Sequence, residues 1–434
     1  MRGLVLVLFV LTTLPMAFAE PFIGFLLWAL FSYMNPYREV YGFAAHLHWV
    51  QIISIVTLLS MLINSNRLQR IRWDATSILL VLFLLWTAFT TFFAVMHTLA
   101  VAAWIQFFKI QVLVFATLML VTDKRRMHWL IWVIVLSFGF WAAKGGVFTL
   151  LKGGQYHVVG PRDSFYGDNN QFALVMCMTL PLMRYLQLQL KSKWMSLGIW
   201  GLMALTVLSI LGSYSRGGLI ALGAVLLMLI MKGRYRFRVL LIIAVSVPLA
   251  FNFLPPKWKD RMDTLQHAGQ TQSLQERFQS WEFATNVAIA RPYTSGGFTS
   301  WASADLWQQY GPPGAMQRAI HSIFFQVLGE QGFVGLGLFL ALLFAGWRNL
   351  AIARRAARGD PSLRWLGDLA GFLQVSFVGY VVAGAALPQA YFNFTYELLA
   401  LTVLVKIWAQ QGIREDEPIK GLSGSRRGIA RGLQ

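Results

Sequence analysis

The chain has 434 residues, of which 57% are hydrophobic and only 13% charged, and it carries a formal net charge of +19. Soluble domains carry about 25% charged residues, so this composition indicates an integral membrane protein. Nucleic-acid binding is a poor explanation of the positive charge, because most Lys and Arg lie in short loops between apolar runs. With only 18 acidic residues, a carboxylate cage for a metal ion is unexpected, and we expect no metal and no other cofactor.

Residues 1–35 hold two successive apolar runs, and their interpretation decides the topology of the rest of the chain. The first run resembles a signal peptide, with Ala17-Phe18-Ala19 as a candidate cleavage site. Two complete crossings starting inside would place all later basic loops outside. Parity therefore favours one net crossing, broken near Pro15 and Pro21, with a helical hairpin as the open alternative.

The remaining apolar runs are near 20 residues long, the length of a membrane-spanning helix. The loops between them are rich in Arg and Lys on one side only, which the positive-inside rule assigns to the cytoplasm. The sequence therefore predicts an all-α polytopic membrane protein with about 12 transmembrane helices and both termini in the cytoplasm. The predicted spans are 48–63, 75–96, 98–121, 128–150, 168–186, 194–213, 216–232, 238–254, 321–347, 366–387 and 389–410.

Four segments follow from this topology. Residues 1–254 form the N-terminal transmembrane helices, and 255–320 form a large helical loop that faces outward. Residues 321–411 form the C-terminal transmembrane helices, and 412–434 form a basic cytoplasmic tail of small and polar residues that is predicted to be disordered.

An outward-facing junction at 161–174 (PRDSFYGDNNQFAL) concentrates polar residues ahead of a helix. Its Arg162 and Asp168 are candidates for secondary substrate contacts. Asp168 is equally suited to cap the next helix, and both interpretations stay open.

A second outward-facing junction reads LGSYSRGGLIAL at 211–222. Arg216 stands where the positive-inside rule disfavours a cation, and ionisable groups near the hydrocarbon are costly and most often functional. The glycines that follow it would let a ligand approach the free N–H groups of a helix start. Tight helix packing explains the same glycines, and the two interpretations are compatible. Tyr214 and Ser215 line this junction as secondary candidates.

Within the outward loop, 273–290 (SLQERFQSWEFATNVAIA) has the pattern of an amphipathic helix. Its apolar face is predicted to comprise Leu274, Phe278, Trp281, Ala284 and Ala288. Arg277 falls within the same arc. It is interpreted either as a residue that reaches the headgroups or pairs with a neighbouring glutamate, or as a cation aimed into a polar cavity between the spans.

The next span opens with HSIFFQVLGEQG at 321–332. His321 lies at the outer face, at the depth predicted for Arg216 and Arg277. Two arginines at one membrane surface indicate a diphosphate ligand, because the planar guanidinium binds two oxygens at once and keeps its charge. Further candidates for secondary contacts are Gln326, Glu330, Arg291 and Arg318.

The order of these motifs resembles the O-antigen ligase and polymerase superfamily. The resemblance rests on Ser-Arg-Gly-Gly at 215–218, on Glu276-Arg277 in the outward loop, and on HSIFFQVLGEQGFVGL at 321–336. The last is similar to the family pattern His-Asn-x-x-Leu followed by Glu-x-Gly-x-x-Gly, with Ser322 in place of the asparagine. The chain is also similar to the O-glycosylation ligases found beside exosortase systems.

The resemblance implies an O-antigen ligase in the bacterial inner membrane with its active site facing the periplasm. Such an enzyme transfers a polysaccharide from undecaprenyl pyrophosphate to a sugar hydroxyl of lipid A-core, with inversion and without a metal. In that role His321 is the catalytic base, and Arg216 and Arg277 bind the donor pyrophosphate.

Three alternatives remain open. An O-antigen polymerase or a protein O-oligosaccharyltransferase would use the same donor with another acceptor. A transporter of lipid-linked sugars would also suit 12 spans, but the polar residues gather at one face and the two halves show no duplication.

Overall fold

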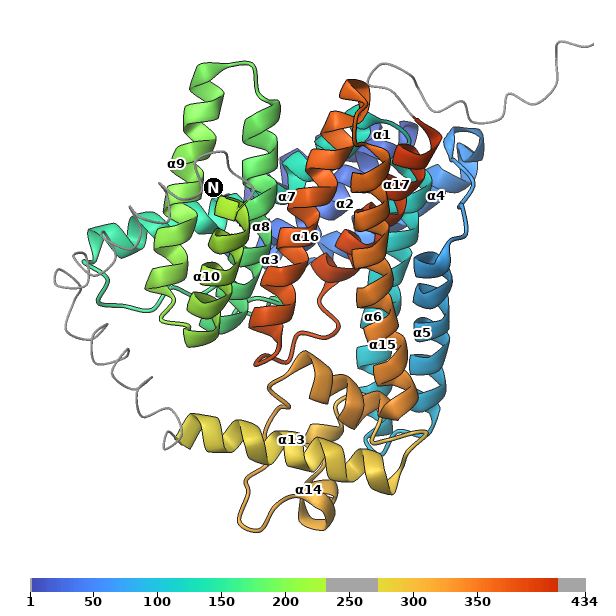
Figure 1. Ribbon diagram of the computed structural model, residues 1–434, viewed down its shortest axis with the longest axis vertical. Coiled ribbons are helices and arrows are strands. Elements are labelled where there is room, and N and C mark those ends of the chain that lie inside the picture. The colour runs from blue at the N-terminus through green and yellow to red at the C-terminus, as the bar shows by residue number, and fades with distance from the viewer. Residues whose placement is uncertain (1, 232–271, 413–434) are drawn as a thin grey trace, which may run out of the picture.

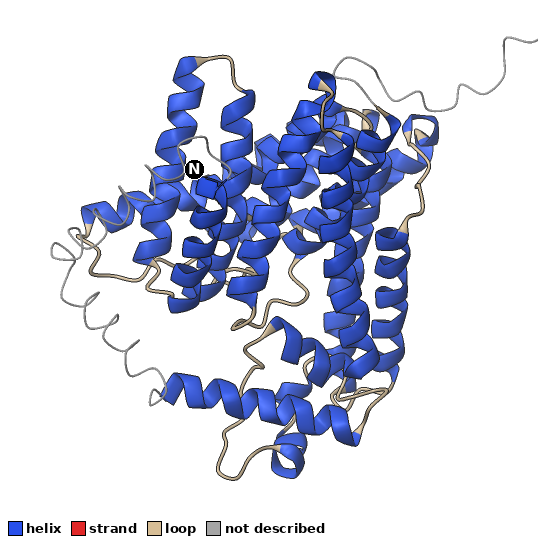
Figure 2. Ribbon diagram, in the orientation of Figure 1, coloured by secondary structure: helices blue, strands red, loops and turns tan. Residues whose placement is uncertain are grey.

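The computed structural model describes residues 2–231 and 272–412, and within these ranges the regular structure is helical, with no strand (Figure 2). The helices are α1 (Arg2–Ala19), α2 (Pro21–Met34), α3 (Phe43–His46), α4 (Trp49–Ile63), α5 (Ala75–Phe92), α6 (His97–Leu120), α7 (Lys124–Leu151), α8 (Asn169–Gln189), α9 (Lys193–Gly212), α10 (Arg216–Met231), α13 (Gln272–Ala290), α14 (Ala304–Tyr310), α15 (Ile323–Ala356), α16 (Arg364–Gly384) and α17 (Asn393–Gln411). The expected span 238–254 and the tail 413–434 lie outside the described residues.

Most predicted spans coincide with a helix of the structure to within a few residues. Of the described helices, seven are long and apolar enough to cross a membrane, namely α1, α5, α6, α7, α9, α15 and the segment Pro361–Gly384 that contains α16. The helices α2, α4 and α10 are apolar but shorter. The chain is therefore an all-α multi-pass membrane protein, while the total of 12 crossings stays a prediction.

The N-terminal segment corrects the predicted topology, because α1 and α2 form an antiparallel hairpin rather than one broken crossing. The rings of Phe9 and Phe31, about equally far from the junction between the two helices, stack with their centroids 6.5 Å apart. A Cβ atom built on Gly3 would lie 3.3 Å from the Cβ of Ala44, which follows α2. The start of α1 and the end of α2 thus lie on the same side. The parity argument assumed that the N-terminus lies on the same side as the basic loops. With the hairpin, that assumption no longer holds.

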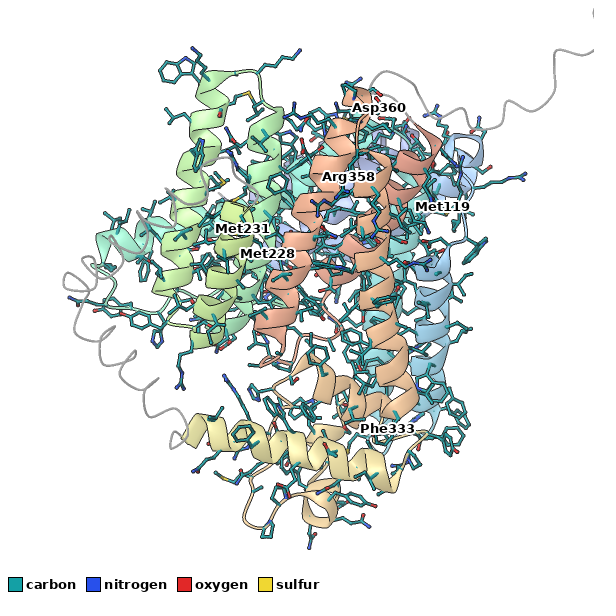
Figure 3. The ribbon with its side chains drawn as sticks, in the orientation of Figure 1. Met119, Met228, Met231, Phe333, Arg358 and Asp360 are labelled. Carbon is teal, nitrogen blue, oxygen red and sulfur yellow. The ribbon has the colours of Figure 1, made fainter. Side chains whose placement is uncertain are left out.

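The loops between the helices fall at two ends of the bundle (Figure 1). At one end, here called the basic end, Glu20 pairs with Arg67 of one basic loop and with Arg126 near the next. Figure 3 shows Arg358 and Asp360 at this end and Phe333 toward the other, beside α13. The other end is called the site end, because the candidate site residues Arg216, Arg277 and His321 lie there.

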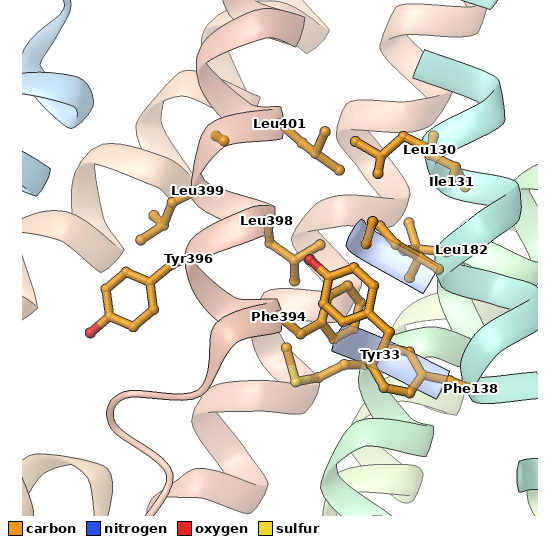
Figure 4. Close-up of a cluster of buried hydrophobic side chains, with 14 of the residues drawn as sticks. Tyr33, Leu130, Ile131, Phe138, Leu182, Phe394, Tyr396, Leu398, Leu399 and Leu401 are labelled. Atoms are coloured by element: carbon orange, nitrogen blue, oxygen red, sulfur yellow. The ribbon is translucent and has the colours of Figure 1, made fainter. Parts of the chain in front are cut away.

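The core of the bundle lies where α2, α7, α8 and α17 meet (Figure 4). The rings of Tyr33, Phe138 and Phe394 pack against one another with centroids 5.1–6.0 Å apart, and all three side chains are fully buried. Buried apolar area of this kind stabilises the helices against one another. The C-terminal helices are thereby locked onto the N-terminal ones.

Helix α13 confirms the expected amphipathic helix but corrects its buried face. The helix lies across the site end of the bundle (Figure 1). Ala284 and Ala288 are buried as expected, whereas Phe278 is 53% exposed. Phe283 and Val287, outside the predicted face, are fully buried, and the Phe283 ring stacks on Trp307 of α14 at 4.1 Å. The predicted face was wrong because α14 covers a second side of α13, which a single-stripe pattern does not anticipate.

Helix α15 is kinked at Gly332, whose φ of 71° and ψ of −171° are not helical. The kink frees backbone carbonyls for partners outside the helix. The Gly329 carbonyl accepts hydrogen bonds from the hydroxyls of Ser295 and Ser300, at 2.7 and 3.1 Å, and the Gln331 carbonyl accepts one from the indole of Trp86 at 2.9 Å. The Glu-x-Gly-x-x-Gly motif thus serves here to dock the segment 291–303 onto α15.

Gly332→Ala is expected to destabilise the protein by roughly 1–3 kcal/mol, because φ is positive and a Cβ atom would lie 2.7 Å from the Pro292 carbonyl oxygen. Thermal unfolding of the purified protein measures the effect. Gly337→Ala is the matched control on the same helix, since a Cβ there meets nothing within 4 Å. Equal unfolding temperatures for the two variants would show that the kink is not required.

Candidate functional site

His321 lies immediately before α15 at the site end, with its ring oriented by the backbone. Its Nδ1 is 2.7 Å from the carbonyl oxygen of Ala319. Because a carbonyl only accepts, Nδ1 carries the proton and Nε2 keeps its lone pair. The next residue, Ser322, accepts a hydrogen bond from the Phe324 N–H and caps α15, a role that asparagine fills equally well. Nε2 is therefore suited to take a proton from a ligand hydroxyl.

Burial and several charged side chains around His321 shift the pKa of its imidazole. Burial lowers the pKa of His321 below its ordinary value, and the charges of Arg277 and Arg318 lower the pKa further. The hydrogen bond to Ala319 and the charge of Asp168 act in the opposite direction. His321, Arg277, Asp168 and Arg318 are called the His321 cluster below. Its net effect is to keep the imidazole neutral, the form that acts as a base.

Arg277 lies near His321 because α13 packs against the start of α15. The indole of Trp281 donates a hydrogen bond to the His321 carbonyl at 3.1 Å, and its ring stacks on Phe325 at 5.0 Å. Arg277 precedes Trp281 by about one helical turn, so the same contact holds both residues near the imidazole. Sequence reasoning placed Trp281 on the apolar face and missed this positioning role.

Arg318 has an acid partner beside it. Its guanidinium is 3.0 Å from the Glu276 carboxylate, and the Arg318 side chain is only 15% exposed. Its Nε donates to the Met316 carbonyl at 3.0 Å. The pair holds the segment before His321 against the start of α13.

Arg216 is the first residue of α10, and the two residues before it have structural roles. The Ser215 hydroxyl accepts a hydrogen bond from the Gly218 N–H at 3.0 Å, which caps the helix. Tyr214 has a φ of 57° and donates its hydroxyl proton to the Gly154 carbonyl. These contacts account for Tyr214 and Ser215 without a ligand.

The two glycines after Arg216 divide between the two expected roles. A Cβ atom on Gly218 would lie 2.4 Å from the Cβ of Ala173, so this glycine permits α10 to pack closely on α8. A Cβ atom on Gly217 would meet nothing within 4 Å. Gly218 thus serves packing, while the space at Gly217 leaves the helix start open.

The start of α8 connects Arg216 to the His321 cluster. Asp168 caps α8 by accepting a hydrogen bond from the Asn170 N–H at 2.8 Å. The next residue, Asn169, donates from its amide to the Ser213 carbonyl at 2.8 Å, just before α10. Three helix starts, those of α8, α10 and α15, thus meet at the site end. Asp168 therefore caps α8 and also raises the pKa of His321, while its predicted contact with a substrate stays a prediction.

Of the other predicted secondary contacts, Arg291 and Arg162 lie apart from the His321 cluster, and Gln326 and Glu330 bond to backbone groups. Arg291 stands at the far end of α13, about 21 Å along the helix from Arg277, and donates to the Phe93 carbonyl at 3.0 Å. Gln326 and Glu330 are buried in α15, where they accept hydrogen bonds from the N–H groups of Ala390 and Thr299 at 3.1 Å. Arg162 is exposed and lines a cavity of the N-terminal helices.

Within residues 2–231 and 272–412, no group of three or more His, Cys, Asp or Glu side chains is placed to hold a metal ion. That the reaction needs no metal stays a prediction.

Asp168→Asn is expected to shift the acid limb of the pH–rate profile to lower pH. Asp168 raises the pKa of His321, so its removal lowers that pKa and keeps the base unprotonated in more acidic solution. Asparagine caps helices as well as aspartate, so α8 should keep its cap. The measurement is kcat/KM against pH with the donor fixed. An unchanged limb would mean that Asp168 does not act on the catalytic group.

Comparison with known families agrees with this arrangement. Residues 201–340 match the family model described as O-Antigen ligase, and this range contains Arg216, Arg277 and His321. Residues 1–190 match a family of unknown function (DUF5935). No curated protein matches the chain. The match over residues 201–340 supports membership of the O-antigen ligase superfamily, and it implies a membrane enzyme of glycosyl transfer in general.

Proposed function

We propose that the protein is an O-antigen ligase that transfers a polysaccharide from undecaprenyl pyrophosphate to a sugar hydroxyl of lipid A-core. The observation that supports this best is the orientation of His321. Its Nδ1 is held by Ala319, its Nε2 is left available, and the cation Arg277 acts on the same ring. A neutral base beside fixed cations suits attack by a hydroxyl on a sugar that is leaving a diphosphate.

In the proposed reaction the acceptor oxygen attacks the anomeric carbon of the donor sugar. Nε2 of His321 takes the hydroxyl proton as the new glycosidic bond forms. The bond between the anomeric carbon and the diphosphate oxygen breaks, and the electron pair leaves with the undecaprenyl diphosphate. Arg216 and Arg277 stabilise that charge more in the transition state than in the ground state. Attack opposite the leaving group inverts the anomeric configuration.

The membrane orientation is part of the proposal. The basic end would face the cytoplasm, and the site end would face the periplasm of a bacterial inner membrane. Both lipid substrates would then enter sideways between the helices at the outer leaflet. The segment that carries α13 and α14 lies over this end and is suited to cover the bound substrates.

Chelation is expected to leave the rate of transfer unchanged, because cationic side chains replace a metal at the diphosphate. The measurement is transfer by purified protein before and after EDTA. An arginine-dependent mechanism would be contradicted by activity that is lost in EDTA and restored by a divalent ion.

The function is tested by the surface polysaccharide of a deletion strain, complemented with the wild-type gene. A ligase leaves full-length polymer on the lipid carrier and lipid A-core without polymer. Single repeat units would instead indicate a polymerase. Loss of glycoprotein with normal lipopolysaccharide would indicate a protein O-oligosaccharyltransferase. Movement of lipid-linked sugar by purified protein, with no glycosidic product, would indicate a transporter.

A further inference from the structure

The N-terminal helices contain two cavities that the proposed reaction does not use. The first has a volume of about 640 Å³ and is lined entirely by residues between Tyr37 and Asp163. The second, of about 540 Å³, is lined by residues between Trp28 and Phe165 together with Asn393. Both volumes are typical of small-ligand sites. The cavities share Tyr37, Arg38 and Asp163, and they fall almost wholly within the region of unknown function, residues 1–190.

Two ion pairs form part of the lining. Lys144 is 2.8 Å from the Glu39 carboxylate, and Arg38 is 3.4 Å from that of Asp163. The guanidinium of Arg38 also donates to the Asp163 carbonyl at 3.1 Å. Exposed pairs of this kind contribute little to stability. Their charged atoms remain able to bond a hydroxyl-rich ligand.

Two further cations line the cavities without an acid partner among the described residues. Arg162 belongs to the first cavity and Lys109 to the second, and both are exposed. Lys109 is the more informative, because it lies near the middle of α6, a helix long and apolar enough to span a membrane. A cation at that depth is costly and is retained where it faces a ligand or a polar cavity.

The second cavity is polar in other ways that suit a headgroup. Gln51 of α4 and Gln106 of α6 line it, together with Asn393 at the start of α17. Amide side chains on helices of this kind, next to a lysine, provide donors and acceptors where lipid chains offer none. A ligand that carries both hydroxyl groups and negative charge can bond to the amide side chains and to the lysine.

The loop after the first cavity leads to the His321 cluster. Asp163 lines both cavities, and the Phe165 carbonyl accepts a hydrogen bond from the Gln389 amide at 2.9 Å. Asp168, five residues after Asp163, acts on His321. An amphiphile in the cavities would thus lie beside the loop that positions Asp168.

We propose that the two cavities form a binding site for the headgroup of an anionic amphiphile. Its phosphate or carboxylate groups bind Lys109 and Arg162, and its hydroxyl groups bind the paired charges and the amides. The apolar chains extend into the membrane beside α4 and α6. This site is separate from the diphosphate site of Arg216 and Arg277.

Binding to the full-length protein in neutral-lipid nanodiscs tests the proposal with two probes, phosphatidylglycerol and lipid A. Lys109→Gln and Arg162→Gln should each weaken binding about tenfold, since each removes one charge-assisted contact. Lys152→Gln is the matched control, because Lys152 is an exposed cation of the same region that lines neither cavity. All three variants should unfold at the wild-type temperature.

The two probes separate the sources of the ligand. Tighter binding of lipid A that depends on both cations identifies a glycolipid site, and equal binding of both probes identifies a general anionic-lipid site. Wild-type affinity of both variants for both probes would overturn the proposal. Because the measurement does not involve glycosyl transfer, its failure would leave the proposed function standing, and the converse holds for a loss of transfer in variants of His321.

Discussion

Replacing His321 by alanine is expected to lower glycosyl transfer by about 10²- to 10⁴-fold, the range typical of a removed general base. The imidazole is the group whose free Nε2 can take the acceptor proton, since its Nδ1 is bonded to Ala319. Donor binding should persist, because the diphosphate is assigned to Arg216 and Arg277. The measurements are transfer by the purified variant and its affinity for the lipid-linked donor.

The control for this variant is His97→Ala. His97 is an exposed histidine that begins α6, also at the site end, and it is not part of the His321 cluster. The His97→Ala variant should transfer the glycan at the wild-type rate. If His321→Ala kept more than a tenth of the wild-type rate, the proton would have to leave by another route, and the proposed mechanism would be wrong.

The pH dependence of the wild-type enzyme follows from the same residue. Burial and the nearby arginines lower the pKa of His321, so the base stays neutral below the pH at which free histidine protonates. Transfer should therefore be lost on acidification only below about pH 6.5, the ordinary pKa of histidine. A group whose pKa were raised would lose activity already at neutral pH.

The helices themselves could be predicted from sequence, because apolar runs near the thickness of a bilayer leave little alternative to a helix. The hairpin of α1 and α2 could not be predicted from sequence. The charge of a loop indicates on which side of the membrane that loop lies, but it does not show how the chain before the first basic loop folds. The path of that segment is decided by contacts such as Phe9 on Phe31. The buried face of α13 was mispredicted for a related reason, since Phe283 packs on α14 and not on the bundle.

At the candidate site, the residue types were predictable and their arrangement was not. A cation beside an apolar run is energetically costly and is therefore most often functional. This argument identified Arg216 and Arg277 as candidates. The carbonyl of Ala319 that orients His321, and the carbonyls freed by Gly332, are backbone groups with no side-chain signal. Glu330 was predicted as a secondary substrate contact, and its hydrogen bond from the Thr299 N–H had no signal in the sequence.

Arg216→Ala and Arg277→Ala are each expected to lower transfer by about 10²- to 10³-fold and to weaken donor binding, because each removes a charge that stabilises the leaving diphosphate. Lysine at either position should restore only part of the activity, since a single ammonium lacks the planar fork that binds two oxygens. Arg291→Ala is the control, because Arg291 directly follows α13 and its guanidinium donates to the Phe93 carbonyl far from Arg277. It should retain transfer.

The two arginines are distinguished by their effect on His321. Arg277 lowers the pKa of His321, so Arg277→Ala should raise that pKa and shift the acid limb of the residual activity to higher pH. Arg216 is proposed to act on the diphosphate alone, so Arg216→Ala should leave the limb in place. Near wild-type product from Arg216→Ala would refute a clamp formed by both residues. A loss of rate with an unmoved limb in Arg277→Ala would place that arginine on the diphosphate alone, too far from the imidazole to influence its proton.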